Sequence, residues 1–235
     1  MTCDEVMGEL AALGTEATKR VLRKHGAVEP FFGVKIEDLK TLVKRCKADQ
    51  ELALALWDSG NGDARYLAGL ICVPQRLTRE ILQHWAETAN WSMLSEYTVA
   101  WCAAESPHGL ELALEWIESP RELAACAGWA TLSSLAGITA DEQLDLVLYR
   151  GLLRRVRETM PTSPNRVRHV MNGFVIATGG HVAPLTEEAL TVAAALGTVQ
   201  VEMGGTACRV PDAVAYLGKM RARGVIGKKR KSARC

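Results

Sequence analysis

The sequence predicts an all-α fold in which short helices pair and stack into a superhelical solenoid. Three observations predict this class: residues that cap helix starts recur along the chain, glycines stand where apolar-periodic segments end, and strand-like alternation is nearly absent. Of the 235 residues, 48% are hydrophobic and 23% are charged, which fits a chain with a sizeable core and excludes a disordered or collagen-like one.

Capping patterns mark the helix starts. Thr2–Glu5 and Thr139–Glu142 each place a hydroxyl three residues before a glutamate, and Ser119–Glu122 adds a proline at the first helical position. Five glycines are expected to end helices: Gly14, Gly26, Gly60, Gly137 and Gly197. The predicted helices span residues 4–13, 16–25, 36–47, 49–59, 62–73, 78–89, 92–105, 107–118, 120–136, 140–160, 164–178, 186–196 and 211–223. Only residues 199–203 alternate like a strand.

An internal echo indicates repeats. Residues 51–54 and 111–114 are both Glu-Leu-Ala-Leu, and each is followed by a tryptophan, Trp57 or Trp116. The spacing of 60 residues corresponds to two helical pairs of about 30 residues each, a length typical of helical repeats. Stacked pairs offer a long concave surface. No linker rich in Pro, Gly or Ser interrupts the sequence, so we expect one helical domain over residues 1–223 and a flexible basic tail over 224–235.

Charge is unevenly distributed although the formal net charge is only +1. Residues 219–235 hold eight basic residues and no acidic one, which leaves the rest of the chain at −7. Residues 19–47 carry a local +6, residues 49–148 carry −11 and residues 149–169 carry +5. The neutral total therefore excludes a uniformly basic DNA-binding protein, but not one that binds through its edges and its tail.

Three basic segments are candidates for contact with a phosphate backbone. Lys40, Lys44 and Lys47 form a stripe on one predicted helix. Six arginines lie on either side of one inter-helix turn: Arg150, Arg154, Arg155, Arg157, Arg166 and Arg168. The tail adds Lys228, Lys229, Arg230 and Lys231. An ordinary solvated face explains either helical stripe equally well, and the tail has the alternative role of a disordered solubilising segment.

No cofactor or metal site is expected. The seven cysteines form no CxxC pair, the five histidines are dispersed, and Asp4, Glu5 and Glu9 interrupt any N-terminal signal peptide. The odd number of cysteines, with apolar neighbours, indicates reduced, buried thiols in a cytoplasmic protein. The longest uncharged stretch, residues 123–140, contains hydroxyl side chains and glycines and favours a buried helix over a membrane span.

Four segments carry a family resemblance: Gly33–Leu39, Glu51–Ser59, Asp63–Ala68 and Trp91–Ser95. Together they resemble the AlkD-like DNA alkylation repair family, over a match that runs from about Phe32 to Gly180. That family is built of HEAT-like helical repeats, and its active members are DNA glycosylases that remove N3- and N7-alkylated purines. The resemblance implies a positively charged concave face that holds duplex DNA, with the damaged base near an aromatic and acidic cleft.

The family's site is matched only in part. Trp91 stands at the cleft tryptophan, and active members carry an aspartate four residues later, where this chain has Ser95. The second cleft aromatic falls at Phe174, while the family's arginine falls near Ala125 or Cys126. A serine cannot supply the negative charge that an oxocarbenium-like transition state needs, and such electrostatic groups are worth roughly 3–4 kcal/mol.

No catalytic residue is therefore assigned, and Trp91, Ser95 and Phe174 are the residues expected to line a DNA or lesion cleft. Glu96 is only a weak substitute carboxylate, since we expect it about 100° around the helix from Ser95 and solvated in the first turn. The expected cleft also lies in the segment that carries −11, so DNA binds there only if those carboxylates face outward.

The leading hypothesis is a DNA-binding protein that resembles this family, contacts the DNA backbone with its concave face, and has weak or no glycosylase activity. Two alternatives stay open: an active 3- or 7-alkylpurine DNA glycosylase, and a protein-binding helical-repeat scaffold. The expected partner is duplex DNA, damaged or branched, and the protein is expected to act as a monomer without a membrane.

Overall fold

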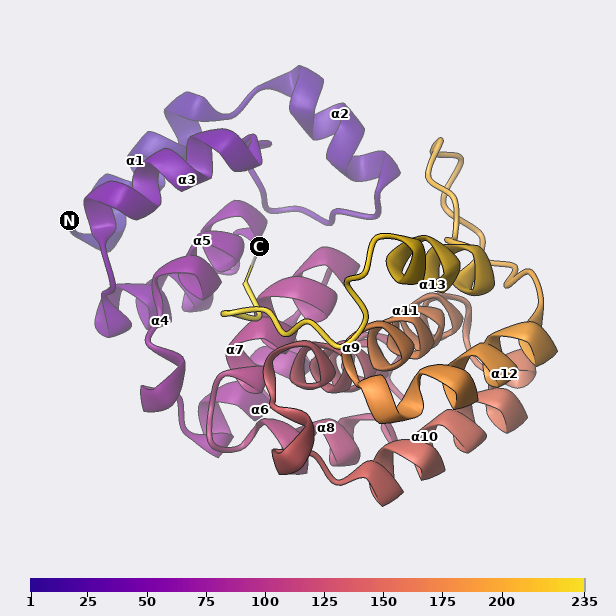
Figure 1. Cartoon of the computed structure of the whole chain (residues 1–235). Coiled ribbons are helices and arrows are strands. Elements are labelled where there is room, and N and C mark those ends of the chain that lie inside the picture. The colour runs from indigo at the N-terminus through magenta and orange to yellow at the C-terminus, as the bar shows by residue number, and fades with distance from the viewer. Residues whose placement is uncertain (235) are drawn as a thin grey trace.

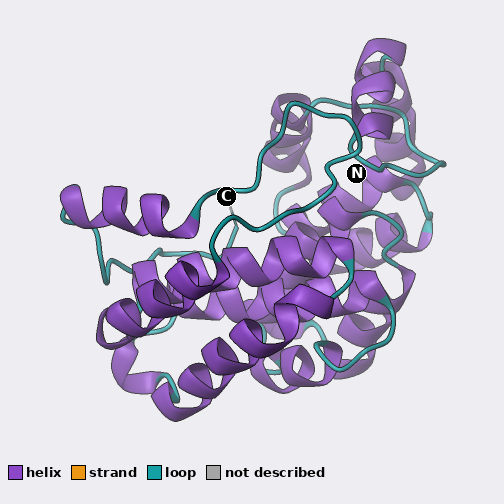
Figure 2. Cartoon of the chain, turned by 90° about the vertical axis from the view of Figure 1, so that its right-hand side faces the viewer, coloured by secondary structure: helices purple, strands orange, loops and turns teal. Residues whose placement is uncertain are grey.

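A computed structural model of the chain describes residues 1–234, and all regular structure in that range is helical (Figure 2). The predicted all-α class is confirmed. The α-helices are α1 (Cys3–Leu13), α2 (Glu16–Lys24), α3 (Ile36–Cys46), α4 (Gln50–Asp58), α5 (Gly62–Ile71), α6 (Arg79–Thr88), α7 (Ala100–Ala104), α8 (Gly109–Trp116), α9 (Glu122–Ile138), α10 (Leu146–Thr159), α11 (Asn165–His181), α12 (Thr186–Leu196) and α13 (Ala213–Ala222). Short 3-10 turns are η1 (Pro74–Arg76), η3 (Asp141–Gln143), η4 (Met160–Thr162) and η5 (Ala183–Leu185), and η2 (Leu94–Val99) is a π-helix.

The helices form two curved layers. Figure 1 shows α4, α6, α8, α10 and α12 along the outer edge, with α5, α7, α9, α11 and α13 on the inner side. Successive inner and outer helices pack as pairs, so each pair buries its apolar face against its neighbours. The predicted stack of helical pairs is therefore the architecture of the chain.

The 60-residue sequence echo falls on two equivalent outer helices, α4 and α8. Trp57 ends the first echo, and its Nε1 donates a hydrogen bond to Thr88 Oγ1 at 3.0 Å. Trp116 ends the second, and its Nε1 donates to Gln83 Oε1 at 2.7 Å. Both acceptors lie on α6, the outer helix between them, so the repeated tryptophans connect neighbouring pairs.

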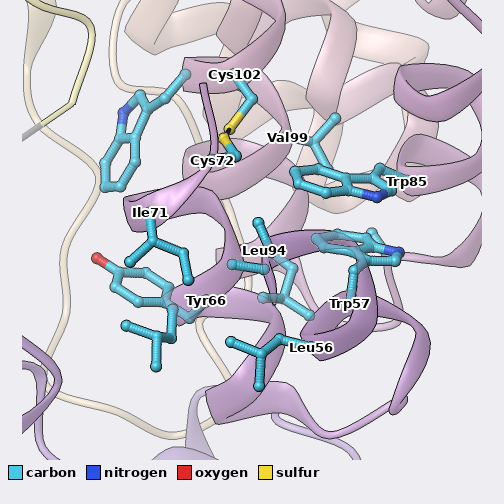
Figure 3. Close-up of a cluster of buried hydrophobic side chains, with 14 of the residues drawn as sticks. Leu56, Trp57, Tyr66, Ile71, Cys72, Trp85, Leu94, Val99 and Cys102 are labelled. Carbon is cyan, nitrogen blue, oxygen red and sulfur yellow. Dashed lines mark hydrogen bonds between the residues drawn. The ribbon is translucent and has the colours of Figure 1, made fainter. Parts of the chain in front are cut away.

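Aromatic stacking and packed aliphatic side chains form the core of the first half of the solenoid (Figure 3). The rings of Trp57 and Trp85 stack with their centroids 4.4 Å apart and their planes inclined by 10°. On the other side of this cluster the Sγ atoms of Cys72 and Cys102 lie 3.3 Å apart, with both thiols buried. Because α4, α5, α6 and α7 each contribute to it, this cluster joins successive pairs.

A buried carboxylate fixes the segment between α2 and α3. Asp63, in the first turn of α5, accepts backbone N–H bonds from Phe32, Gly33 and Val34 at 2.6, 2.9 and 3.1 Å. Burial raises the pKa of Asp63, and these three bonds oppose the rise. Gly33 has a φ of +81°, so the chain turns here in a conformation that favours glycine.

Several predicted helix boundaries are wrong. The predicted cap at Ser119 does not start α9, which begins at Glu122 with Arg121 as its N-cap. Thr139 does not start a helix: it is the C-cap of α9, and α10 begins only at Leu146, where Asp145 accepts a bond from Leu148 N. Asp145 caps α10 because its Oδ1 accepts the Leu148 backbone N–H at 2.9 Å, and aspartate is preferred over threonine as an N-cap residue. Gly137 does not end α9 either; it lies inside the helix, where an added Cβ would approach the Arg230 guanidinium to 2.8 Å.

The segment expected to be a flexible tail follows a defined path. Residues 224–234, called the strap below, run across the C-terminal ends of α11, α9, α7 and α5 (Figure 1). Gly227 N and Arg230 N donate to the carbonyls of Gly180 and Gly137 at 2.9 and 2.8 Å. At the far end, the Arg234 guanidinium donates to the carbonyls of Leu70 and Cys72 at 3.1 and 3.0 Å.

The strap is therefore hydrogen-bonded along its length, in contrast to the flexible tail expected from composition. Its basic side chains complement the partial negative charge of helix C-termini. Residue 235 lies outside the described residues.

Candidate functional site: an inner-face cleft

A cleft of about 1140 Å³ opens at the N-terminal ends of α9 and α11. One wall is the second half of α2, the other is the loop over residues 202–211, and the floor includes η2. The amino ends of both long helices carry partial positive charge, which favours an anionic ligand. Three further cations line the walls: Arg23, Lys24 and Arg209.

Two asparagines of α11 hold the loop wall in place. Asn165 Nδ2 donates to the carbonyl of Glu202 at 2.9 Å, and its Oδ1 accepts from Glu202 N at 2.8 Å. Asn172 Nδ2 donates to the carbonyl of Pro211 at 2.9 Å. The loop that carries Arg209 is thus attached to the inner layer at both of its ends.

Trp91 lies at the junction of the floor and the α2 wall. Its side chain is 5% exposed, and its Nε1 donates to the carbonyl of His25 at 2.9 Å. All side chains of α2 are exposed or half-buried, so α2 has little core of its own. Trp91 therefore lines this cleft and also attaches the α2 wall to the floor.

Trp91 lies in a bend just before the helical segment that begins at Ser92. Ser95 is one turn later, and its backbone N–H donates to the Trp91 carbonyl at 3.2 Å. The rule that residues i and i+4 share a face applies only when both belong to the helix. Ser95 is fully buried, and its Oγ has no hydrogen-bond partner within residues 1–234. Ser95 is absent from the cleft lining, so the expected sharing of one open face by Trp91 and Ser95 is not observed.

Glu96 is buried and paired, which corrects the expectation of a solvated carboxylate. Its side chain is 5% exposed and makes a bidentate ion pair with Arg166 of α11, in which Arg166 Nη2 donates to Oε2 at 2.7 Å and Nε donates to Oε1. Burial raises the pKa of Glu96, and the bonds from Arg166 oppose that rise. The negative charge of Glu96 is thus matched by the guanidinium of Arg166, which itself lines the cleft.

A second carboxylate, Glu122, was not identified from the sequence. It is half-buried in the cleft floor, and its Oε1 accepts the Arg166 backbone N–H at 2.6 Å. It lies in the first turn of α9, where acidic residues are common, so no sequence signal separates it from an ordinary helix start. His169 also lines the cleft. Burial lowers the pKa of His169 to about 4, with a smaller contribution from the charge of Arg166, so this imidazole is neutral at pH 7.

Comparison with known proteins identifies the chain's relatives. The family described as DNA alkylation repair enzyme matches residues 6–209. The chain belongs to the DNA alkylation repair family. Uncharacterized proteins from Listeria monocytogenes and Listeria innocua are each 35% identical over 229 residues, which cover 95% of this chain and 99% of theirs.

A solved structure covers the whole of this DNA alkylation repair family member. It is described as "a new family of proteins related to the HEAT-like repeat DNA glycosylases with affinity for branched DNA structures". It is 36% identical in sequence to this chain, covers 100% of both chains and superposes with a TM-score of 0.91. The HEAT-like repeat fold predicted from the sequence is therefore confirmed.

Phe174 of this family member lies in the core, which corrects its prediction as a cleft aromatic. It is fully buried, 5.2 Å from the ring of Trp129 and 5.8 Å from that of Tyr149. At the expected arginine position, Ala125 and Cys126 are buried. Burial raises the pKa of the Cys126 thiol; the charges of Glu96 and Glu122 add to this rise, and the charge of Arg166 opposes it.

The arginines of α10 lie on the outer layer, away from the cleft. Arg150 pairs with Glu188 of α12 at 3.1 Å, and Arg155 pairs with Glu118 beside α8, with Nη2 to Oε2 at 2.9 Å. Arg154 and Arg157 are exposed on the same outer helix. Arg150 and Arg155 therefore join outer helices, and the arginines expected to form one phosphate-binding patch do not share one face with Arg166.

The other predicted cations are dispersed. Lys40 and Lys44 are exposed on α3, and Lys47 is its C-cap with a φ of +56°. Arg168 is half-buried and donates to Asn165 Oδ1 at 3.3 Å. In the strap, Lys229 pairs with Asp141 at 2.8 Å, while Lys228, Arg230 and Lys231 stay exposed. Sequence patterns thus located exposed cations in the strap but missed Arg23, Lys24 and Arg209, which only the fold brings to one cleft.

The described part of the chain contains no cluster of three or more His, Cys, Asp or Glu residues arranged to hold a metal ion. Among residues 1–234, no helix has the length and apolar character needed to span a bilayer.

Proposed function

We propose that this protein binds branched DNA through its concave face, mainly by contacts to the phosphate backbone. One observation carries the proposal: cations line an inner-face cleft in a chain whose full length matches a structure described as having affinity for branched DNA. Backbone contacts suit this face because Lys24 and Arg209 stand on opposite walls, where two strands can approach. Arg23 also lines the cleft but is paired with Glu29 at 2.6 Å.

We further propose that base excision is weak or absent. The resemblance to active members of the family implies an aspartate in the cleft at the position of Ser95. In this chain Ser95 is buried and does not line the cleft. The nearest downstream carboxylate, Glu96, is held by Arg166. Loss of one electrostatic group that stabilises a transition state costs roughly 10²–10³ in rate, so residual excision is expected to be slow.

Binding is tested by fluorescence anisotropy with a labelled four-way junction and a linear duplex of the same sequence and length. The junction is expected to bind more tightly, and both affinities are expected to fall as salt rises, because bound counterions are released from phosphates. Equal affinity for the two DNAs would contradict the preference for branches. No binding at low salt would overturn the proposal and favour a protein-binding scaffold.

A glycosylase role is the second candidate, and the position of the Glu122 carboxylate favours it. This carboxylate lines the same cleft as Trp91. The assay measures release of 7-methylguanine and 3-methyladenine from alkylated DNA by the wild-type chain and by Glu122→Gln. Release that disappears in the variant while DNA binding persists would establish this activity; no release from either protein supports the binding role alone.

A further inference from the structure

A second hollow continues from the cleft along the inner face. This groove has a volume of about 480 Å³ and shares Tyr97 and His169 with the cleft. Its floor is formed by α9 and α11, one wall by η2 and α7, and the other by α13 and the start of the strap. It is therefore large enough for a single small organic ligand but too small for a double helix.

Small side chains keep the floor of the groove open. Ala130 and Ser133 face it from α9, and Gly173 and Ala177 face it from α11. The spacing of three or four residues places each pair on one helix face. A flat ligand can therefore approach both helices closely.

Two exposed tyrosines stand on opposite walls. Tyr97 of η2 is 41% exposed and Tyr216 of α13 is 47% exposed, and both line the groove. The ring of Trp101 supports Tyr97 from below, with their centroids 5.4 Å apart. Exposed aromatic rings in a concave, cation-lined site are typical platforms for stacking unpaired bases.

Positive charge lies on the same side as Tyr216. Arg223 ends α13 and Arg230 belongs to the strap, and both line the groove. The Arg230 backbone N–H donates to the Gly137 carbonyl at 2.8 Å, and its guanidinium packs against Gly137, so its position is fixed. The one carboxylate in the lining, Glu96, is paired with Arg166 and offers little repulsion to a phosphate.

We propose that this groove binds one unpaired deoxynucleotide next to a DNA branch point. Its base stacks on Tyr97 and Tyr216, and its phosphates lie against Arg223 and Arg230. The inference rests on the proposed function and deepens it, because it selects branched DNA with unpaired nucleotides over fully paired branches. Stacking is tolerant of sequence, so the groove is expected to accept any base.

The test compares a fully paired four-way junction with the same junction carrying one unpaired 2-aminopurine at the branch. Wild-type protein is expected to bind the second more tightly and to quench its fluorescence by stacking. Tyr216→Ala is expected to weaken that binding by at least about fivefold and to relieve the quenching, while Tyr216→Phe retains both. Affinity for the paired junction is expected to stay unchanged in either variant.

Matched variants keep the outcome interpretable. Val214→Ala removes an apolar side chain that is 43% exposed on the same helix but lies outside the groove lining, and it is expected to leave both DNAs unaffected. Tyr97→Phe keeps the ring that packs on Trp101, and it is expected to retain both binding and quenching, as Tyr216→Phe does. Equal affinity for the two junctions, or no quenching, would overturn the groove assignment while leaving junction binding intact. Tighter binding of a single-stranded RNA of the same sequence would likewise overturn the assignment to DNA.

Discussion

At the scale of single residues, the pair Glu96–Arg166 determines which charges are available to a ligand in the cleft. A carboxylate that is 5% exposed and bidentately bound cannot approach a sugar in the cleft without losing its partner. Arg166 also connects two helices through its side chain and through its backbone bond to Glu122. Glu96 is therefore not a free acid; together with Arg166 it links η2, α9 and α11.

Arg166→Gln is expected to be strongly destabilising at neutral pH. It leaves Glu96 buried without its cation, at a cost of about 3–5 kcal/mol. Burial already raises the pKa of Glu96, and without Arg166 this pKa rises further. A carboxyl whose pKa is higher in the folded than in the unfolded state binds protons preferentially in the native state. The free energy of unfolding is therefore expected to rise as the pH falls from the folded pKa of Glu96 towards its unfolded pKa. Urea denaturation at pH 7 and at pH 5 measures this recovery.

The double variant Glu96→Gln/Arg166→Gln is the control for this prediction. Like the single variant, it lacks Arg166 and retains His169. The pKa of His169 is lowered to about 4 in the fold, so protonation of His169 in acid destabilises both variants alike. The difference in unfolding free energy between the single and double variants therefore isolates Glu96. A difference that is the same at both pH values would show that Glu96 is not the titrating group.

At the scale of elements, the sequence predicted most helices but not their special turns. Periodicity and capping identified the pairs, and Thr2 forms its predicted capping box. The π-turn of η2 was missed because it depends on packing against α5 and α9 rather than on a residue pattern. The strap was missed for a related reason: its composition resembles a solvated tail, whereas its acceptors are carbonyls at helix ends far away in the sequence.

Strap contacts are expected to stabilise the fold through two cations in particular. Lys229 Nζ donates to the Ala136 carbonyl at 2.9 Å and pairs with Asp141, while Arg234 binds two carbonyls near the end of α5. Both side chains are 21% exposed. Since hydrogen bonds to charged groups contribute about 1.5–3 kcal/mol each, Lys229→Ala/Arg234→Ala is expected to lower the unfolding free energy by about 2–4 kcal/mol in guanidinium titrations.

Lys228→Ala/Lys231→Ala removes the same charge from the same segment and is the matched control. Both lysines are exposed, so their replacement is expected to change stability by less than about 0.5 kcal/mol. Equal destabilisation by the two double variants would indicate that net charge, rather than the capping of helix ends, accounts for the effect.

At the scale of the whole molecule, folding separates charges that are adjacent in the sequence. Several acidic side chains of residues 49–148, the segment that carries −11, have partners outside the cleft. Glu115 and Glu118 pair with arginines of outer helices. Glu105 and Asp141 bind the strap, and Asp63 accepts bonds from the segment before α3. The sequence predicted that an acidic stretch could flank a DNA site only if its carboxylates faced elsewhere. It could not show which cations meet on the inner face, because Lys24 and Arg209 are far apart in the chain.

This separation makes the salt dependence of DNA binding diagnostic of the inner face. If Lys24 and Arg209 each neutralise one phosphate, Lys24→Ala/Arg209→Ala is expected to reduce the magnitude of the slope of log K against log salt by about 1.8. Arg154→Ala/Arg157→Ala changes the net charge equally, but on the outer helix α10, and is expected to preserve the slope. Anisotropy titrations of the four-way junction across a salt series measure both slopes. Equal reductions would mean that the protein attracts DNA through its overall charge, whereas a reduction confined to the inner pair would locate the DNA backbone in the cleft.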